Sequence, residues 1–308
     1  MRILFMGTPE FAMHNLEAIH NTNNEIVGVV TTPDKPKGRG MVLTPSPVKA
    51  YALENGLNVY QPTTLKDGAF LDTLKELDPE LIIVVAYGKI LPEYVLNYPK
   101  YACINAHASI LPKYRGAAPI QRAIMDGDTK TGVSIMKMDI GLDTGDVILV
   151  EEVSIEPNDN FESVHDKLIL ASNQGLLKTI ELFENGKATF KKQGDNFTYA
   201  EKITKVDCLI DFSADVNAVH NKIRGLSPIP LSYTKLPDGK ILKVTKAHVC
   251  DNDYNGEFGE VVGLDGGIMV KCQNGVIVLD EIIPEGKGKM SAQAFLNGRK
   301  IAKGDILG

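Results

Sequence analysis

The 308-residue sequence has no long apolar segment, no paired cysteines and no metal-ligand spacing. No apolar run approaches the roughly 20 residues that a membrane-spanning helix needs, so we expect a soluble, cytosolic protein. None of the four cysteines (Cys103, Cys208, Cys250 and Cys272) forms a CxxC pair, which argues against a cysteine zinc site and a disulfide framework. No histidine lies at metal-ligand spacing from another His or Cys, and we expect no metal.

Several familiar signatures are also absent. Gly38-Arg39-Gly40 has no glycine three residues later and no GxxxxGK[ST] run occurs, which argues against a nicotinamide or nucleoside-triphosphate enzyme. Asp143-Thr144-Gly145 matches the triplet of an aspartic protease, but a second such triplet is missing. The net charge of -6 argues against indiscriminate nucleic-acid binding, although a local basic patch could still serve an RNA substrate.

The first half of the sequence contains a series of short apolar segments. Those at 2–6, 25–31, 58–61, 81–86, 102–106, 133–138 and 147–153 are typical of strands. The segment 81–86 is apolar throughout, as in a parallel strand covered on both faces. Helix signals alternate with these segments, including a stretch at 163–184 that ends at Asn185-Gly186. The pattern predicts an α/β domain with a Rossmann-like, doubly wound, mostly parallel sheet.

The pattern changes after residue 189. Candidate strands at 231–235, 241–248, 259–262, 268–271 and 276–280 are separated by turn signals such as Asn274-Gly275. Strands of this length and spacing predict a small β-barrel. We therefore expect a first domain at 1–189, a linker at 190–205 and a β-barrel domain at 206–308.

Three polar residues between positions 103 and 147 suggest acyl-transfer chemistry. Asn105 and His107 are two apart on a predicted strand, so both side chains point to one face at its carboxyl end, where open α/β sheets bind ligands. Transfer of an acyl group to an amine needs a donor for the oxyanion, a proton carrier and a group that orients this carrier. Asn105, His107 and Asp143 could supply these functions. For a lone His or Asp, a capping histidine and a turn aspartate are the simpler interpretation.

Longer runs around these residues resemble a known family. The run HASILPKYRGAAPIQ at 107–121, followed by GLDTGD at 141–146, is similar to the signature of the folate-dependent formyltransferases. The runs MGTPEF at 6–11 and MSAQ at 290–293, and the segment 33–49, are similar to this family too, so the resemblance covers essentially the whole chain. The loop at 224–230 departs from it, because the family commonly has a tryptophan there and this chain has none.

The resemblance implies an enzyme that transfers the formyl group of 10-formyltetrahydrofolate to the α-amino group of methionine on initiator tRNA. It implies that Asn105 and His107 stabilise the oxyanion and that His107, held by Asp143, assists proton transfer to the leaving nitrogen. It also implies a folate-binding set at the carboxyl ends of the strands. This set comprises Tyr87, Gly88, Lys89, Ile90, Leu91, Pro92, Ser109, Ile110, Leu111, Pro112, Asp139, Ile140 and Gly141.

The resemblance further assigns tRNA binding to the basic segment 33–49, with Arg39 as the principal contact, and to an OB-like barrel. The candidate tRNA-binding residues are Lys35, Lys37, Arg39, Lys49, Lys222, Arg224, Lys243 and Lys246. By composition alone, the segment 33–49 is more typical of a solvated loop, and charge runs are usually solvated faces. We expect the protein to act as a monomer.

Two other functions stay open at this point. A folate-dependent formyltransferase that acts on a ribonucleotide or an amino sugar would share Asn105, His107 and Asp143 without needing the basic segment or the barrel. A non-catalytic RNA-binding module would need only the barrel and its cations.

Overall fold

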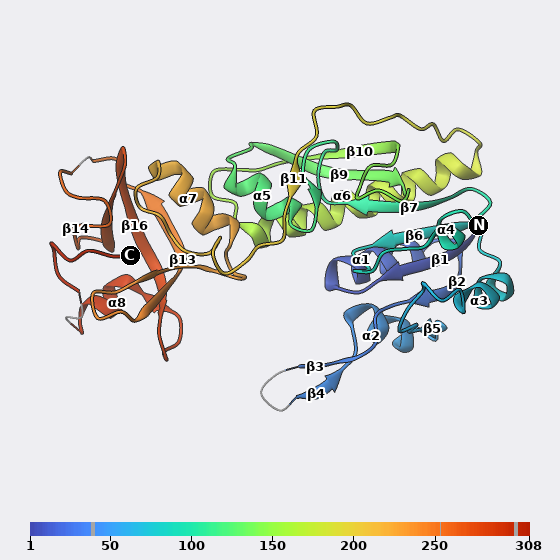
Figure 1. Ribbon diagram of the computed structural model, residues 1–308, viewed down its shortest axis with the longest axis horizontal. Coiled ribbons are helices and arrows are strands. Elements are labelled where there is room, and N and C mark those ends of the chain that lie inside the picture. The colour runs from blue at the N-terminus through green and yellow to red at the C-terminus, as the bar shows by residue number, and fades with distance from the viewer. Residues whose placement is uncertain (38–40, 253, 299–300) are drawn as a thin grey trace. The chain divides into compact units, whose positions relative to one another are not determined.

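The computed structural model describes residues 1–37, 41–252, 254–298 and 301–308 (Figure 1). The chain divides into two compact units. The first comprises Met1–Gly116, Thr131–Val153 and Asp166–Tyr199, and the second comprises Ala117–Lys130, Ser154–His165 and Ala200–Gly308. Two segments that precede residue 189 thus belong to the second unit, and the domain boundaries at 189 and 206 stay a prediction.

A seven-stranded sheet forms the centre of the first unit. Its strands are β1 (Arg2–Gly7), β2 (Glu25–Val30), β5 (Val59–Tyr60), β6 (Leu81–Val85), β7 (Ala102–His107), β9 (Lys130–Lys137) and β10 (Val147–Ser154). Their order is β10-β9-β7-β6-β1-β2-β5 (Figure 1). Pairing from β5 to β7 is parallel throughout, and β9 joins β7 antiparallel. The predicted doubly wound, mostly parallel sheet is confirmed.

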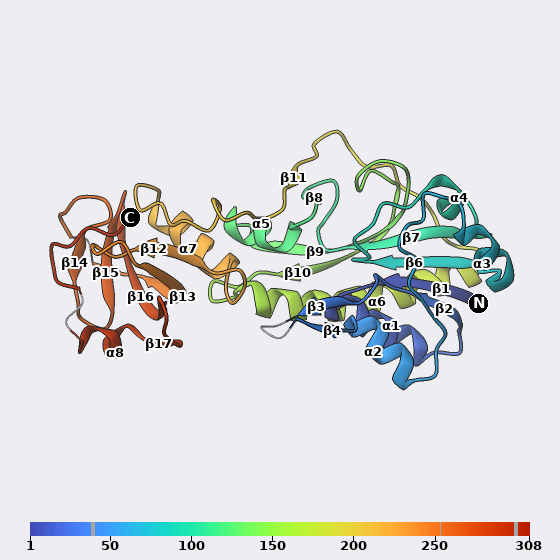
Figure 2. The ribbon, with the colours of Figure 1, turned by 60° about the horizontal axis from the view of Figure 1, so that its bottom comes forward.

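Helices cover both faces of this sheet. Leu4 of β1 and Ile82 of β6 pack in one hydrophobic cluster with residues of α3 (Phe70–Leu77) and α4 (Glu93–Leu96). On the opposite face run α1 (Glu10–His20) and α6 (Phe161–Glu184) (Figure 2), which are joined by a buried hydrogen bond from Ser172 to Asn15. Gly175 lets α6 lie close to Ile135 of β9. The central strands β1, β6 and β7 are therefore buried on both sides, as continuous apolar runs require.

The basic segment near the N-terminus contains a small hairpin that its composition did not predict. β3 (Lys35–Lys37) pairs antiparallel with β4 (Val42–Thr44), and α2 (Pro47–Glu54) follows. Ser46 caps α2 by accepting a hydrogen bond from the Lys49 amide, and Pro47 occupies the first turn, where its missing N–H has no cost. Two further short strands, β8 (Arg115–Gly116) and β11 (Tyr199–Ala200), form a separate pair.

The second unit is built on an antiparallel sheet. Its elements are α5 (Pro119–Met125), α7 (Val216–Gly225), β12 (Ser232–Lys235), β13 (Ile241–Val249), β14 (Val261–Gly263), β15 (Ile268–Cys272), β16 (Gly275–Pro284), β17 (Met290–Ser291) and α8 (Ala292–Leu296). The strand order is β12-β13-β16-β15-β14, with β17 beside β16. α7 and α8 contribute Val219 and Phe295 to the hydrophobic core of this sheet. A C-terminal antiparallel β domain is therefore confirmed.

Candidate active site

β7 carries two of the predicted site residues on one face. Asn105 and His107 alternate with Ile104 and Ala106, which are buried on the other face. β6 and β7 pair in parallel, with Val84 opposite Asn105, so the segments that follow both strands leave the sheet at the same edge. The sequence predicted this arrangement correctly.

Both ring nitrogens of His107 face protein oxygens. Nε2 lies 2.9 Å from the main-chain oxygen of Tyr114, and Nδ1 lies 3.6 Å from Oδ2 of Asp143. A carbonyl oxygen only accepts, so the proton must be on Nε2 in the neutral ring, which leaves the Nδ1 lone pair toward Asp143. The His107 side chain is only 6% exposed and that of Asp143 14%. The pair thus forms a shielded site where a proton on Nδ1 would face a carboxylate.

Asp143 adopts an unusual backbone conformation. Its φ is 52°, in the left-handed region that residues other than glycine adopt at a cost of about 1–2 kcal/mol. Oδ2 accepts a 2.8 Å hydrogen bond from the Gly116 amide, which directs the carboxylate toward His107. Residues in such a conformation persist when their surroundings hold them there.

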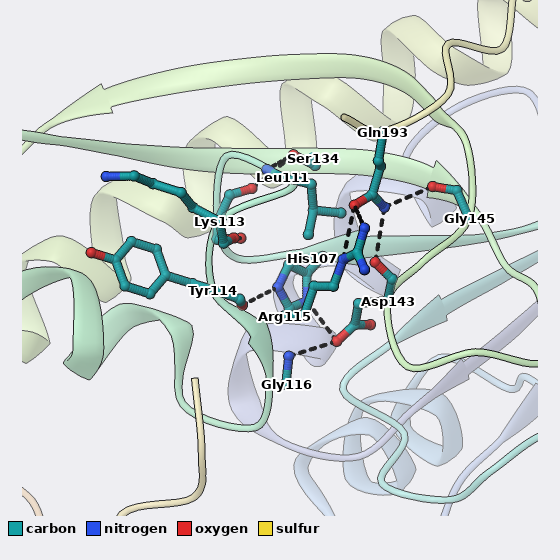
Figure 3. A network of polar contacts seen from close by, with 11 residues as sticks. His107, Leu111, Lys113, Tyr114, Arg115, Gly116, Ser134, Asp143, Gly145 and Gln193 are labelled. Carbon is teal, nitrogen blue, oxygen red and sulfur yellow. Dashed lines mark hydrogen bonds and ion pairs between the residues drawn. The ribbon is translucent and has the colours of Figure 1, made fainter. Parts of the chain in front are cut away.

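Gln193, which the sequence did not suggest, provides part of these surroundings (Figure 3). Its Nε2 donates to the main-chain oxygens of Asp143 and Gly145, at 2.8 Å each. Its Oε1 accepts from Nε and Nη2 of Arg115, at 3.0 and 2.7 Å. No sequence signal pointed to it, because it lies in a polar stretch 50 positions after Asp143.

The side-chain amide of Asn105 differs from the neighbouring polar side chains. It is partly buried, and it makes no hydrogen bond to any residue that the structure describes. An amide at the end of β7 with spare donors can serve an oxyanion beside His107.

Some of the predicted folate-binding residues that follow β6 are buried and others are exposed. Tyr87 and Leu91 are buried in the core, and burial raises the pKa of the Tyr87 phenol to about 12. Ile90 is 78% exposed, and Gly88 is exposed with φ 82°. The Thr8 hydroxyl donates to the Tyr87 carbonyl, linking the ends of β1 and β6, where the strand order reverses. This switch point is the usual ligand site of an open α/β sheet.

Lys89 and Pro92 in this segment have structural contacts. The Lys89 ammonium donates to the carbonyls of Pro62 and Thr63, at 2.7 and 2.8 Å. Burial lowers the pKa of Lys89, and the nearby Lys35 lowers it further. Pro92 is the N-cap residue of α4.

The two other predicted folate-binding segments, 109–112 and 139–141, also differ in exposure. Ser109 and Leu111 are buried: the Ser109 hydroxyl donates to the Lys113 carbonyl, and the Leu111 amide donates to the Ser134 hydroxyl. Ile110 and Pro112 beside them are partly exposed. The segment 139–141 is exposed, and Asp139 Oδ1 closes its turn by accepting from the Gly141 amide and the Thr144 hydroxyl.

The tRNA-binding residues predicted in segment 33–49 that the structure describes belong to the β3–β4 hairpin and to the start of α2, which follows it. Lys35 is exposed on β3, whereas Lys49 forms a 2.7 Å ion pair with Asp34, which also accepts from Gln61. The Lys49 hydrogen bond, followed by that of Gln61, lowers the pKa of Asp34. Lys37 lies on β3 by its backbone, and Arg39 lies outside the described residues.

The cations of the second unit also differ in their engagement. Arg224 donates to the carbonyls of Glu156 and Asp159, and Lys222 donates to the Leu209 carbonyl. Lys243 and Lys246 on β13 are exposed.

A bulge explains why both of these lysines are exposed. Residues three apart on a regular strand point to opposite faces. The register of β13 against β16 shifts between Val244 and Ala247, so Leu242, Val244 and Ala247 all point inward. The extra residue returns Lys246 to the side of Lys243.

Two further findings concern the described residues only. They contain no group of three or more His, Cys, Asp or Glu side chains that could hold a metal ion. Within the same ranges, no helix has the length and apolar character needed to cross a bilayer.

The fold and the site together define a class of protein. An α/β domain that brings an amide, a histidine and a carboxylate to the carboxyl edge of its sheet, joined to an antiparallel β domain, has the parts of a two-domain group-transfer enzyme. The family model for formyl transferases matches residues 1–180, and the model for the formyl transferase C-terminal domain matches residues 202–300.

Curated relatives are similar over the whole chain. The methionyl-tRNA formyltransferase of Geotalea daltonii is 46% identical over 310 residues, which cover 100% of this chain and 98% of the relative. That of Clostridium novyi is 46% identical over 311 residues and 100% of both chains. The chain therefore belongs to the formyl transferase family, and the prediction of a formyltransferase from its motifs is confirmed.

Solved structures share the fold. An N-formyltransferase from Helicobacter canadensis, solved with folinic acid and dTDP-3-aminofucose, has a TM-score of 0.70 at 19% identity, covering 91% of this chain and 98% of its own. HypX from Aquifex aeolicus in complex with tetrahydrofolic acid has a TM-score of 0.66 at 17% identity, covering 96% of this chain and 47% of its own. At these identities the likeness concerns the fold alone.

Proposed function

We propose that the protein transfers the formyl group of 10-formyltetrahydrofolate to the α-amino group of initiator methionyl-tRNA. The observation that carries this proposal is the placement of the Asn105 amide and the His107–Asp143 pair at the carboxyl edge of β7. The full-length similarity to methionyl-tRNA formyltransferases selects the acceptor. The protein acts as a cytoplasmic monomer and needs no metal.

The chemistry follows from the geometry. The neutral amine attacks the formyl carbon, and the carbonyl oxygen becomes an oxyanion that accepts an N–H from Asn105. His107 receives the amine proton at Nδ1, because Nε2–H is already donated to Tyr114. The resulting imidazolium is stabilised by Asp143 and adds to the stabilisation of the oxyanion. As the bond from the formyl carbon to N10 breaks, the proton passes to N10, so charge and protons balance.

The folate donor would lie along the exposed part of the edge. Gly88, Ile90, Ile140 and Gly141 are exposed there, and Ile90 and Ile140 offer apolar side chains to a flat ring. The buried residues of the same segments, such as Tyr87 and Ser109, would fix the backbone that contacts the folate. Such a site combines apolar walls with a few fixed polar groups, as small-molecule sites do.

The tRNA would be held by exposed cations. Lys35 on the hairpin and Lys243 and Lys246 on β13 have the exposure that phosphate contacts need. Arg39 and Lys37 are further proposed contacts. Lys49, Lys222 and Arg224 would contribute less directly, since each is hydrogen-bonded to its own unit.

One assay separates the candidate functions. The purified protein is incubated with 10-formyltetrahydrofolate and either charged initiator tRNA, elongator methionyl-tRNA or glycinamide ribonucleotide. We expect formylation of the initiator tRNA. Formylation of the small nucleotide alone would overturn the proposal in favour of a small-amine formyltransferase, and no formylation of any acceptor would leave only RNA binding.

A charge reversal tests the hairpin within the same assay. Arg39→Glu should raise KM for methionyl-tRNA while the KM for the folate stays constant. Lys187→Glu is the matched control, because Lys187 is an exposed cation of the first unit outside the proposed surface. Equal kinetics for the two variants would remove the hairpin from tRNA recognition.

A further inference from the structure

Gln193 occupies a central position in the network around Asp143. Its amide lies between the Arg115 guanidinium and two main-chain oxygens of the Asp143 loop, and all four hydrogen bonds measure 2.7–3.0 Å. Guanidinium groups only donate and carbonyls only accept. The amide therefore has one possible orientation, with Oε1 toward Arg115 and Nε2 toward the loop (Figure 3).

The chain around Gln193 is fixed on both sides. Two residues earlier, Lys191 exchanges two 2.8 Å backbone hydrogen bonds with Val147 at the start of β10. Five residues later, the Thr198 carbonyl accepts from the Arg115 amide. The Arg115 guanidinium also stacks over the Phe197 ring at 4.7 Å. Segment 191–198 thus holds Gln193 against the loop and holds Arg115 against Gln193.

Arg115 gives these bonds their strength. Its side chain is buried, and the described residues offer its guanidinium no carboxylate partner, so Gln193 Oε1 takes two of its N–H groups. Hydrogen bonds from a charged donor are roughly twice as strong as neutral ones. They also polarise the next bond in a chain, here from Nε2 to the loop carbonyls.

The loop in turn has little freedom to adopt another arrangement. Gly145 sits so close to the Lys137 carbonyl that a Cβ there would clash with it at 1.7 Å. Asp143 has the strained φ of 52°. One amide group that binds both the Asp143 and the Gly145 carbonyls fixes the peptide units that follow these two residues and so the direction of the Asp143 side chain.

We propose that Gln193 is a positioning residue for formyl transfer, acting through Asp143. Arg115 orients its amide, and Nε2 holds Asp143 in the conformation in which Oδ2 meets both the Gly116 amide and His107 Nδ1. This inference rests on the proposed function for its kinetic consequence, while its structural part is independent of the reaction.

Two substitutions separate the donor from the acceptor of this amide. Gln193→Met keeps the side-chain length and removes all four hydrogen bonds. Gln193→Glu keeps the acceptor for Arg115 but places an unprotonated oxygen against the two carbonyls. Gln174→Met is the control, because Gln174 is an exposed glutamine on α6.

The kinetic test is formyl transfer to methionyl-tRNA, with kcat and both KM values determined. Both Gln193 variants should lower kcat by about 10- to 100-fold, with KM values within about 3-fold of wild type, because positioning acts on the transition state. In an Asp143→Ala background, Gln193→Met should lower the single-turnover rate by less than about 2-fold. A merely structural role would instead give additive losses, and additivity would overturn the proposal. Near wild-type kcat for Gln193→Glu would show that Arg115 needs only an acceptor and would overturn it too.

A second measurement does not depend on activity. The Gly116 amide proton is donated to Asp143, so its hydrogen exchange reports where the carboxylate lies. Gln193→Met should speed this exchange by at least about 10-fold relative to Gln174→Met. Unchanged exchange would overturn the positioning role. A wild-type protein that transfers no formyl group would overturn the proposed function, and the exchange result would still decide this inference.

Discussion

Polar side chains at the β7 edge and cations on β13 differ in how firmly the protein holds them. Asp143 accepts hydrogen bonds at its carboxylate and at its main-chain oxygen, and Gln193 uses both ends of its amide. Lys243 and Lys246 are exposed, and neither side chain makes a hydrogen bond to a residue within the described ranges. The protein thus fixes the orientation of the polar side chains at the β7 edge, whereas the lysines on β13 supply only positive charge.

The difference matches the physics of the two tasks. Proton transfer and oxyanion stabilisation depend on atoms placed within a few tenths of an ångström. Attraction to a polyanion depends on the number of charges and tolerates movement of each side chain. Substitutions at the β7 edge should therefore change kcat, and substitutions on β13 should change the binding of tRNA.

The largest effect should follow removal of the proton carrier. His107→Ala should lower kcat by about 1,000-fold, since positioned acid–base groups contribute about 10²–10⁴. His14→Ala is the control, because His14 is a surface residue on α1. The measurement is the rate of formyl-methionyl-tRNA formation by protein with an unchanged circular dichroism spectrum. Near-normal activity of His107→Ala would refute the assignment of roles.

A smaller effect is expected from a cation on β13. Lys243→Glu should raise KM for methionyl-tRNA by about 3- to 10-fold and leave kcat within about 2-fold, because it removes a phosphate contact and adds repulsion. The slope of log KM for methionyl-tRNA against log salt concentration should decrease by about 1, as expected for the loss of one phosphate contact. Lys287→Glu makes the same charge change at another exposed position of the second unit. If kcat fell with KM unchanged, the contrast between the two regions would be lost.

The smallest effect concerns the stability of the second unit. Burial, followed by repulsion from Arg224, lowers the pKa of His220 on α7, and His248 and Asp280 of the adjacent strands also act on it. A lowered folded-state pKa means that stability is fully present above about pH 6.5 and is lost as the pH falls below it. Because His220 is partly exposed, we expect the free energy of unfolding to fall by only roughly 0.5 kcal/mol per pH unit in this range.

Urea unfolding at pH 7.5 and 5.5 tests this dependence. Wild type should lose more stability than His220→Gln over this interval. An equal loss in both proteins would assign the dependence to other groups.

The sequence predicted the sheet well, because its strands are continuous apolar runs. The segments at 81–86 and 102–106 became the paired strands β6 and β7, and strand alternation placed Asn105 and His107 on one face. The approach of Asp143 to His107 was suggested by the needs of acyl-transfer chemistry and by the family resemblance, since local pattern does not reveal how a loop folds back.

Contacts set by tertiary structure escaped prediction. Gln193 reaches Asp143 only because Lys191 pairs with Val147, a register that no local propensity specifies. The hairpin of β3 and β4 forms in a segment whose prolines and glycines are typical of loops. The bulge at Thr245 appears in the sequence as a change of apolar parity between Val244 and Ala247, but this change alone does not identify a bulge.

The location of Gln193 has a consequence for exchanging parts between relatives. The family model for the catalytic half ends at residue 180, but the first compact unit runs on to Tyr199. A chimera joined at 180 would bring in a foreign residue at position 193 and a foreign ring beneath Arg115. A crossover after Tyr199 would take Gln193, Arg115 and the Asp143 loop from the same parent protein.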